Sequence, residues 1–250
     1  MRYRLFFELE NEKISIQYRK SVLSFIKKSL NEYSHDGYEK LYHEKDPIIK
    51  PYTFSVFFRD SEFEGDVILV HSKEMQLNFS IEDYEIAVLL YNSFNHQRNK
   101  IFNLDKNSMI LKNIVLLPEK KILENEVSIK FMSPLIVRQR ENEKDYYFSA
   151  ESEKFLEVLR QNIKEQLKIT NYPPEIVESI NLEKINGRKT VIKFYEKQME
   201  GTIGTFKLSG DVELLNYLYK AGIGSRRSSR IWNVWMFVEN EVIKWKSRFI

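Results

Sequence analysis

The 250-residue sequence has no cysteine, which excludes disulfide bonds, thiolate catalysis and zinc sites that need thiolate ligands. It has only four histidines, and they form neither a His-Glu-x-x-His motif nor a His-x-His pair, so a histidine-ligated catalytic metal is not expected. Asp-x-Asp clusters for paired magnesium ions and the phosphate-binding P-loop are missing as well. The sequence therefore predicts neither a metal nor a cofactor.

Long apolar runs are also missing. No stretch approaches the ~20 uncharged apolar residues that a membrane span needs. The N-terminus meets Glu8 and Glu10 too soon for the apolar core of a signal peptide. We therefore expect a cytoplasmic protein with no membrane partner, and the length favours one or two domains.

Positive charge is concentrated at one end of the chain. The formal net charge is +3, but residues 220–250 hold seven Lys/Arg against two Glu, which leaves the preceding residues slightly negative. A basic end on a nearly neutral body favours a surface for polyanions such as nucleic acids. A solvated charged tail is the alternative, and charge alone does not decide between them.

Hydrophobic periodicity in the first half predicts the order β-α-β-β-α-β. Tyr18, Val22, Ile26 and Leu30 recur at four-residue steps, which indicates an amphipathic helix. A capping box at Ser80 and Asp83 is expected to open a second helix. Residues 31–50 are predicted as a loop with at most one turn of helix. Strands are expected at residues 2–9, 51–58 and 108–118, with a hairpin over residues 66–80 that turns near residues 72–74.

The second half repeats this order. Residues 126–140 are strand-like, residues 152–168 have helical spacing, and Asn186-Gly187 is a favoured hairpin turn. Asp211 should cap a short helix that Gly222 ends. The sequence thus predicts an α+β fold of two tandem ferredoxin-like domains, residues 1–120 and 121–250.

One histidine stands among residues suited to chemistry on a phosphate. His43 lies in "EKLYHEKDPIIKPYTFS", between a predicted helix and a strand, with Lys50 nearby. Histidine exchanges protons near neutral pH, and lysine can stabilise charge on a phosphate oxygen. RNA carries its own nucleophile, the ribose 2′-hydroxyl, so these two groups suffice to cleave it without metal. Taken alone, a single loop histidine is more often a solvated residue.

Three segments of the chain resemble one known family. They are "LYHEKDPIIKPYTFSVFF" (41–58), "FMSPLIVR" (131–138) and "GTFKLSGDVELLNYLYKAGIGSRRS" (204–228), the last being the most specific. They resemble the CRISPR-associated endoribonucleases of the RAMP superfamily, which cut the repeats of precursor transcripts into guide RNAs. The similarity runs along nearly the whole chain in the family's order, and the family has tandem ferredoxin-like domains.

The resemblance implies a metal-independent endoribonuclease. In the family, the 2′-hydroxyl attacks the adjacent phosphate and leaves a 2′,3′-cyclic phosphate and a 5′-hydroxyl. His43 matches the general acid/base histidine, and Lys50 matches a lysine that assists in some members. His35, in the same polar stretch, is a second candidate for proton transfer.

The expected partner is CRISPR repeat RNA in a precursor transcript. Other subunits of a CRISPR effector complex and a second copy of the chain are further partners that the resemblance allows. Glycines permit close approach of backbone N–H groups to phosphates, and serine and arginine add polar and charged contacts. The candidate RNA-binding residues are Gly222, Gly224, Ser225, Arg226, Arg227, Arg138 and Arg140.

Two departures from the family pattern keep other functions open. Phe25 lies where some members have a catalytic tyrosine, and residues 229–233 replace a Leu-Gly-Phe-Gly continuation of the glycine-rich segment. A non-catalytic RNA-binding scaffold of the same superfamily is therefore the first alternative. A protein-interaction module, in which the basic end is incidental, is the second.

Overall fold

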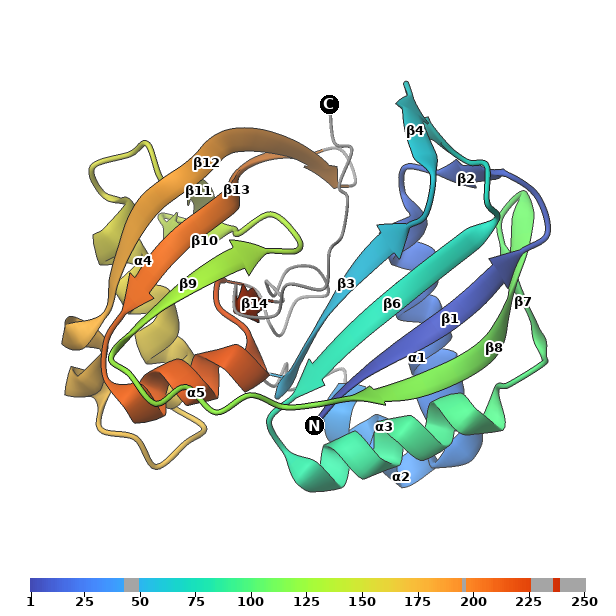
Figure 1. The fold of residues 1–250 in the computed structure, drawn as a ribbon, viewed down its shortest axis with the longest axis horizontal. Helices are drawn as coiled ribbons and strands as arrows, with labels where there is room; N and C mark the ends of the chain where they lie inside the picture. Colours follow the sequence, from blue (N-terminus) through green and yellow to red (C-terminus); the bar gives the residue numbers. More distant parts are fainter. Residues whose placement is uncertain (43–49, 195–196, 226–235, 239–250) are drawn as a thin grey trace.

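The computed structural model describes residues 1–42, 50–194, 197–225 and 236–238. Its N-terminal half contains an antiparallel sheet with the strand order β3-β6-β1-β8-β7. Helices α1 and α3 connect β1 to β3 and β6 to β8, which gives the predicted β-α-β-β-α-β order (Figure 1). The bounds are β1 Arg2–Leu9, α1 Tyr18–Tyr33, β3 Tyr52–Phe58, β6 Glu74–Ile81, α3 Tyr84–His96, β7 Ile101–Leu104 and β8 Asn107–Leu117.

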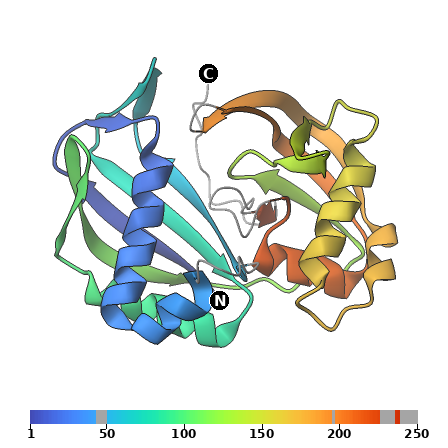
Figure 2. The same cartoon turned by 180° about the vertical axis from the view of Figure 1, so that it is seen from behind.

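The two helices cover one face of this sheet, as Figure 2 shows from behind. Successive side chains of a strand point to opposite faces, so alternate residues of β1 enter the core between sheet and helices. Tyr3, Leu5, Phe7 and Leu9 are these residues, and all are buried. No helix of the described residues is long and apolar enough to cross a membrane.

A small sheet with the order β2-β5-β4 extends the N-terminal half (Figure 1). Its strands are β2 Lys13–Ser15, β4 Ser61–Glu64 and β5 Val67–Val70. The predicted hairpin with a turn near residues 72–74 is therefore wrong, because β5 pairs with β4 and β2, and β6 pairs with β1 and β3. The chain reverses at Gly65, which has a φ of 59°, and Lys73, with a φ of 53°, lies at the bend between β5 and β6.

Two local predictions in this half also need correction. Residues 31–50 contain more than the one turn of helix that was predicted, since helix α2 spans the eight residues His35–Tyr42. Helix α3 is capped by Asp83, whose side chain accepts a hydrogen bond from the N–H of Ile86 at 3.0 Å. Ser80 lies in β6, and the proposed capping box does not form.

The C-terminal half repeats the topology. Its main sheet has the order β12-β13-β9-β14, so the first, second, third and last strands occupy the same relative places as in the N-terminal half. The predicted α+β fold of tandem ferredoxin-like units is confirmed. The bounds are β9 Glu126–Phe131, α4 Phe155–Leu167, β12 Asn181–Phe194, β13 Lys197–Ser209, α5 Val212–Ala221 and β14 Met236–Val238, with the hairpin β10 Val137–Glu141 and β11 Lys144–Phe148 and the short helix η1 Pro174–Ser179.

The predicted hairpin turn at Asn186-Gly187 is wrong. Both residues lie inside β12, which pairs with β13 from Asn181 opposite Ser209 to Phe194 opposite Lys197. Gly187 is needed for another reason, because a Cβ there would lie 2.5 Å from the ring of Phe206. The glycine lets a core aromatic ring pack directly onto the strand.

Buried apolar residues form two large clusters. One runs from Tyr3 to Leu111, and the other from Ile122 to Ile223. We propose that each is the core of one domain, with the boundary near residue 120. Helix α5 of the second half contacts strands β3 and β6 of the first (Figure 1).

Candidate active site

His43 lies outside the described residues, as do Arg226 and Arg227. The structure places the residues on either side of the segment 43–49. Tyr42 is the last residue of α2, and Lys50 comes two residues before β3. The structure therefore describes the two elements between which His43 lies in the sequence, α2 and β3.

A pair of buried tyrosines joins these two elements. The hydroxyls of Tyr42 and Tyr52 are hydrogen-bonded to each other, and the residues are 9% and 5% exposed. Burial raises the pKa of Tyr42 well above its ordinary value, and the neighbouring Tyr52 phenol raises it further. Burial also raises the pKa of Tyr52. Both phenols are therefore neutral at physiological pH, and the pair fixes the base of the segment that carries His43.

Two lysines gather around the ring of Tyr42. The Nζ atom of Lys50 lies 4.8 Å from the ring centroid, and that of Lys27, from α1, lies 5.0 Å from it. Ammonium groups within ~6 Å of an aromatic ring are attracted by its negative face. Lys50 is only 7% exposed. The structure thus places the predicted assisting lysine beside the residue that directly precedes His43.

His35 occupies the opposite end of α2. Its Nδ1 lies 2.9 Å from Oδ1 of Asn31, and its ring stacks on Tyr38, which in turn stacks on Tyr42. With a helical rise of ~1.5 Å per residue, His35 and Tyr42 are ~10 Å apart along the helix axis. The structure therefore does not bring His35 to the Tyr42 end of α2, and its catalytic role stays a prediction.

Phe25 belongs to the core. It is 2% exposed and its ring contacts the rings of Phe7, Phe94 and Phe102. The helix position that resembles the family's tyrosine position therefore faces the sheet and α3, and it contributes packing. Any third group for catalysis must come from another residue.

The backbone of the glycine-rich turn after α5 is hydrogen-bonded to other parts of the protein. Gly222 and Gly224 have φ values of 84° and 121°, a region that favours glycine. The N–H of Gly222 donates to the carbonyl of Leu218 at 2.8 Å, and the side-chain amide of Gln166 donates to the carbonyl of Gly224.

Ser225 is held in the same way. Its N–H and its hydroxyl both donate to the carbonyl of Ile136, at 2.9 and 3.0 Å, and it is 7% exposed. These donors serve the fold in this structure, and the RNA-binding role of Gly222, Gly224 and Ser225 stays a prediction.

The two arginines of the β10–β11 hairpin that were predicted to bind RNA differ in their surroundings. Arg138 forms an ion pair with Asp145 across β10 and β11, with 2.7 Å between Nη1 and Oδ1, and its backbone is bonded to the side chain of Asn162. Arg140 is exposed at the end of β10, and no ion pair to it is found among the described residues. Arg140 is therefore better placed than Arg138 to contact a phosphate.

A contact that the sequence analysis missed attaches helix α5, which precedes the glycine-rich turn, to the N-terminal sheet. The Arg2 guanidinium lies over the ring of Tyr219, 4.3 Å from its centroid, and Nη1 donates to the Tyr219 hydroxyl. The Ser80 hydroxyl also donates to the carbonyl of Tyr219 at 3.3 Å. The alternation in β1 already placed Arg2 opposite Tyr3 on the sheet, but its partner on α5 is visible only in the fold.

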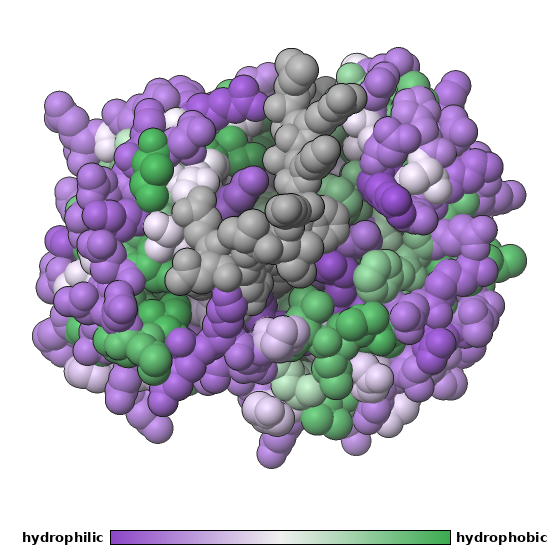
Figure 3. Space-filling model, viewed as in Figure 1, coloured by the Kyte–Doolittle hydropathy of each residue, from purple (hydrophilic) through white to green (hydrophobic). Residues whose placement is uncertain are grey.

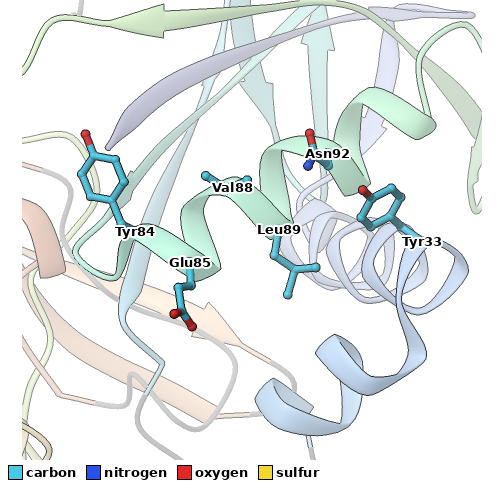
Figure 4. Close-up of a pocket in the computed structure, with 6 residues that line it drawn as sticks. All are labelled: Tyr33, Tyr84, Glu85, Val88, Leu89 and Asn92. Atoms are coloured by element: carbon cyan, nitrogen blue, oxygen red, sulfur yellow. The ribbon is translucent and has the colours of Figure 1, made fainter.

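Other surface features do not add to this site. The face drawn in Figure 3 is hydrophilic over much of both halves, with hydrophobic groups in separate areas. A shallow apolar pocket lies along α3 beside the end of α1, and is lined by Tyr33, Tyr84, Glu85, Val88, Leu89 and Asn92 (Figure 4). The described residues contain no group of three or more His, Asp or Glu side chains that could hold a metal ion. The expectation of metal-free chemistry stays a prediction.

Comparisons with known proteins agree with this architecture. Residues 117–229 match the family model of the CRISPR-associated protein Cas6, C-terminal. No curated protein matches the chain in sequence. A solved structure of a Cas6-related gene product from Pyrococcus furiosus has 20% identity and a TM-score of 0.81, and the alignment covers 95% of this chain and 98% of that one.

A RAMP protein that binds different RNA substrates has 20% identity and a TM-score of 0.80, with 95% and 99% of the two chains covered. A Cas6 product complex has 12% identity and a TM-score of 0.68, with 94% and 99% covered. At these identities the solved structures establish the fold, and the family model covers most of its second half. Residues 117–229 thus match the Cas6 C-terminal family model, and the fold of the whole chain is similar to that of solved Cas6 and RAMP structures.

Proposed function

We propose that the protein is a metal-independent endoribonuclease that cleaves CRISPR repeat RNA in precursor transcripts and so generates guide RNAs. The observation that carries this proposal is the arrangement at the two ends of the segment with His43. There, a buried Tyr42–Tyr52 pair fixes the backbone, and the ammonium group of Lys50 lies 4.8 Å from the Tyr42 ring centroid. His43 follows Tyr42 in the sequence, and a histidine together with a cation beside that tyrosine fits acid/base chemistry on a phosphodiester.

The reaction is an internal transfer within the RNA. The 2′-oxygen loses its proton and forms a bond to phosphorus, while the bond between phosphorus and the 5′-oxygen breaks and that oxygen takes up a proton. His43 carries out proton transfer, and Lys50 stabilises the charge that builds up on the phosphate oxygens. The products are a 2′,3′-cyclic phosphate and a 5′-hydroxyl.

The known relatives support RNA as the partner. Among proteins of similar fold are a Cas6 product complex, a Cas6 substrate-mimic complex and a RAMP protein that binds different RNA substrates. We propose that the repeat RNA contacts both domains and that Arg140, Arg226 and Arg227 bind its phosphates. Other effector-complex subunits and a second copy of the chain are further proposed partners.

The first experiment incubates the purified protein in EDTA with labelled repeat RNA, beside RNA with a 2′-deoxy nucleotide before the cut. We expect cleavage at one position of the unmodified RNA and none of the modified RNA. The His43→Ala variant should lose about 10²–10⁴-fold in cleavage rate and still bind RNA. Cleavage that persists in the 2′-deoxy RNA would show that the 2′-hydroxyl is not the nucleophile.

A non-catalytic RNA-binding scaffold is the second candidate function. Two observations favour it: Phe25 fills the core at the position of the family's tyrosine, and the donors of Gly222 and Ser225 are bonded to protein carbonyls. Tight RNA binding without cleavage by the wild-type protein would select the scaffold, and His43→Ala would then change nothing.

A further inference from the structure

Strands β4 and β12 each have an open edge, on different halves of the molecule. Strand β4 pairs with β5 and β12 pairs with β13, and among the described residues neither has a strand on its other side. The backbone N–H and C=O groups along such an edge can pair with a further strand. Both strands reach the same side of the molecule (Figures 1 and 2).

An exposed aromatic ring marks the edge at β4. Ile14, Ile68 and Phe63 lie in register across the small β2-β5-β4 sheet, so their side chains share one face. Ile14 and Ile68 are 4% and 0% exposed and belong to the N-terminal core, whereas Phe63 is 65% exposed. The apolar row therefore continues to the edge without cover, and an apolar side chain on an added strand would bury the Phe63 ring.

The side chains beside that ring are acidic. Glu62 and Glu64 flank Phe63 on β4, and both are exposed and form no ion pair with a described residue. Two β4 edges brought together would place carboxylates against carboxylates, which repel each other. A strand with positive charge and exposed apolar side chains fits this edge.

Strand β12 has these features. Its Lys184 and Arg188 are exposed and form no ion pair with a described residue. Its Ile185 and Val191 are 53% and 57% exposed. Two β12 edges repel each other as well, so each edge is protected against its own counterpart and is complementary to the other.

We infer that β4 of one copy pairs with β12 of a second copy, in a dimer with a two-fold axis. Because both edges reach the same side of the molecule, a two-fold axis on that side brings β4 of each copy to β12 of the other and forms the contact twice. The exposed apolar side chains of β12 then cover Phe63, and its cations face Glu62 and Glu64. The contact does not depend on RNA cleavage, so dimerisation is expected whether or not the protein cuts repeat RNA.

Sedimentation velocity of the RNA-free protein over a concentration series tests the contact. The wild type should dimerise, with a dissociation constant that rises with salt. Glu62→Lys/Glu64→Lys and Lys184→Glu/Arg188→Glu should each raise that constant about 100-fold or more, because like charges then face each other in both contacts. An equal mixture of the two variants should dimerise like the wild type, since every acidic edge again meets a basic one.

A second pair of variants tests the apolar part of the contact. Phe63→Ala should weaken the dimer about 10-fold, as expected for an aromatic side chain buried at an interface. The control Val88→Ala removes an apolar side chain that is 47% exposed on α3, and it should leave the dimer unchanged. Urea unfolding midpoints near that of the wild type show that all variants fold.

Three results would overturn the contact. The first is a wild type that stays monomeric at every concentration. The second is a mixture of the two charge variants that stays monomeric although each is folded. The third is a dimer that Val88→Ala weakens and Phe63→Ala does not, which would place the interface on α3. Species that keep growing with concentration would refute the two-fold arrangement.

Discussion

At the scale of single residues, Tyr3 carries a buried hydroxyl that the fold does not use. Its side chain is 0% exposed, and the phenol oxygen has no hydrogen-bond partner among the described residues. A buried polar group without a partner costs about 1–3 kcal/mol. We therefore expect Tyr3→Phe to unfold at the same or a higher urea concentration than the wild type at pH 8. Tyr33→Phe, at an exposed position, is the control for loss of a tyrosine hydroxyl.

The buried phenol of Tyr3 should also make the unfolding free energy depend on pH. Burial raises the pKa of Tyr3 well above its ordinary value, so the folded state favours the neutral phenol. This contribution to stability is complete below the unfolded pKa of about 10 and is lost as pH rises through the folded value. Between pH 8 and 10.5, the unfolding free energy of the wild type should fall more steeply than that of Tyr3→Phe. Parallel curves for the two proteins would contradict the assignment.

At the scale of elements, the long β12–β13 hairpin depends on Gly204. Its φ is 135°, and a Cβ there would lie 2.2 Å from the backbone oxygen of Asn186 on the opposite strand. Gly204→Ala should therefore lower the unfolding free energy by about 3 kcal/mol or more, since it adds a backbone clash to a strained φ. Gly65 also has a positive φ, of 59°, but open space around it. As the control, Gly65→Ala should cost only about 1–2 kcal/mol in the same urea titration, and equal losses would refute the clash.

Glycines show where the sequence could not predict the bounds of helices and strands. The ferredoxin-like order and the cap at Asp211 followed from local signals, and the structure confirms them. Asn186-Gly187 suggested a turn, and Gly37 lies in a stretch predicted mainly as loop, yet both glycines lie inside regular elements. Each accommodates a side chain from a distant element, Phe206 over Gly187 and Leu89 over Gly37. Such packing depends on tertiary contacts, which a local pattern does not contain.

The candidate site shows the same limit. The motif around His43 indicated Lys50 because the two are close in sequence. Lys27 lies on another helix, and its proximity to Lys50 follows only from the contact of both with the Tyr42 ring. No short-range spacing connects these residues. Side chains contributed by separate elements therefore need the fold before their proximity can be identified.

At the scale of the whole molecule, charge is divided between two regions. Residues 8–13 and 59–74 hold eight carboxylates against three Lys/Arg, and they form the small β2-β5-β4 sheet and its connections (Figure 1). The excess of Lys/Arg lies in residues 220–250. Lys and Arg in residues 220–250 attract a polyanion, and the carboxylates of residues 8–13 and 59–74 repel it.

This division predicts how RNA affinity responds to salt. Each phosphate neutralised by a lysine or arginine adds about 0.7 to the slope of log affinity against log salt for a single strand. Arg140→Ala should lower that slope by about 0.7, because its exposed side chain has no ion pair among the described residues to hold it away from RNA. Arg59→Ala removes the same charge from the acidic region, where Arg59 pairs with Glu74 at 2.9 Å, and should leave the slope unchanged. Fluorescence anisotropy of labelled repeat RNA over a salt series measures both variants. Equal slopes for Arg140→Ala and the wild type would remove Arg140 from the RNA-binding surface.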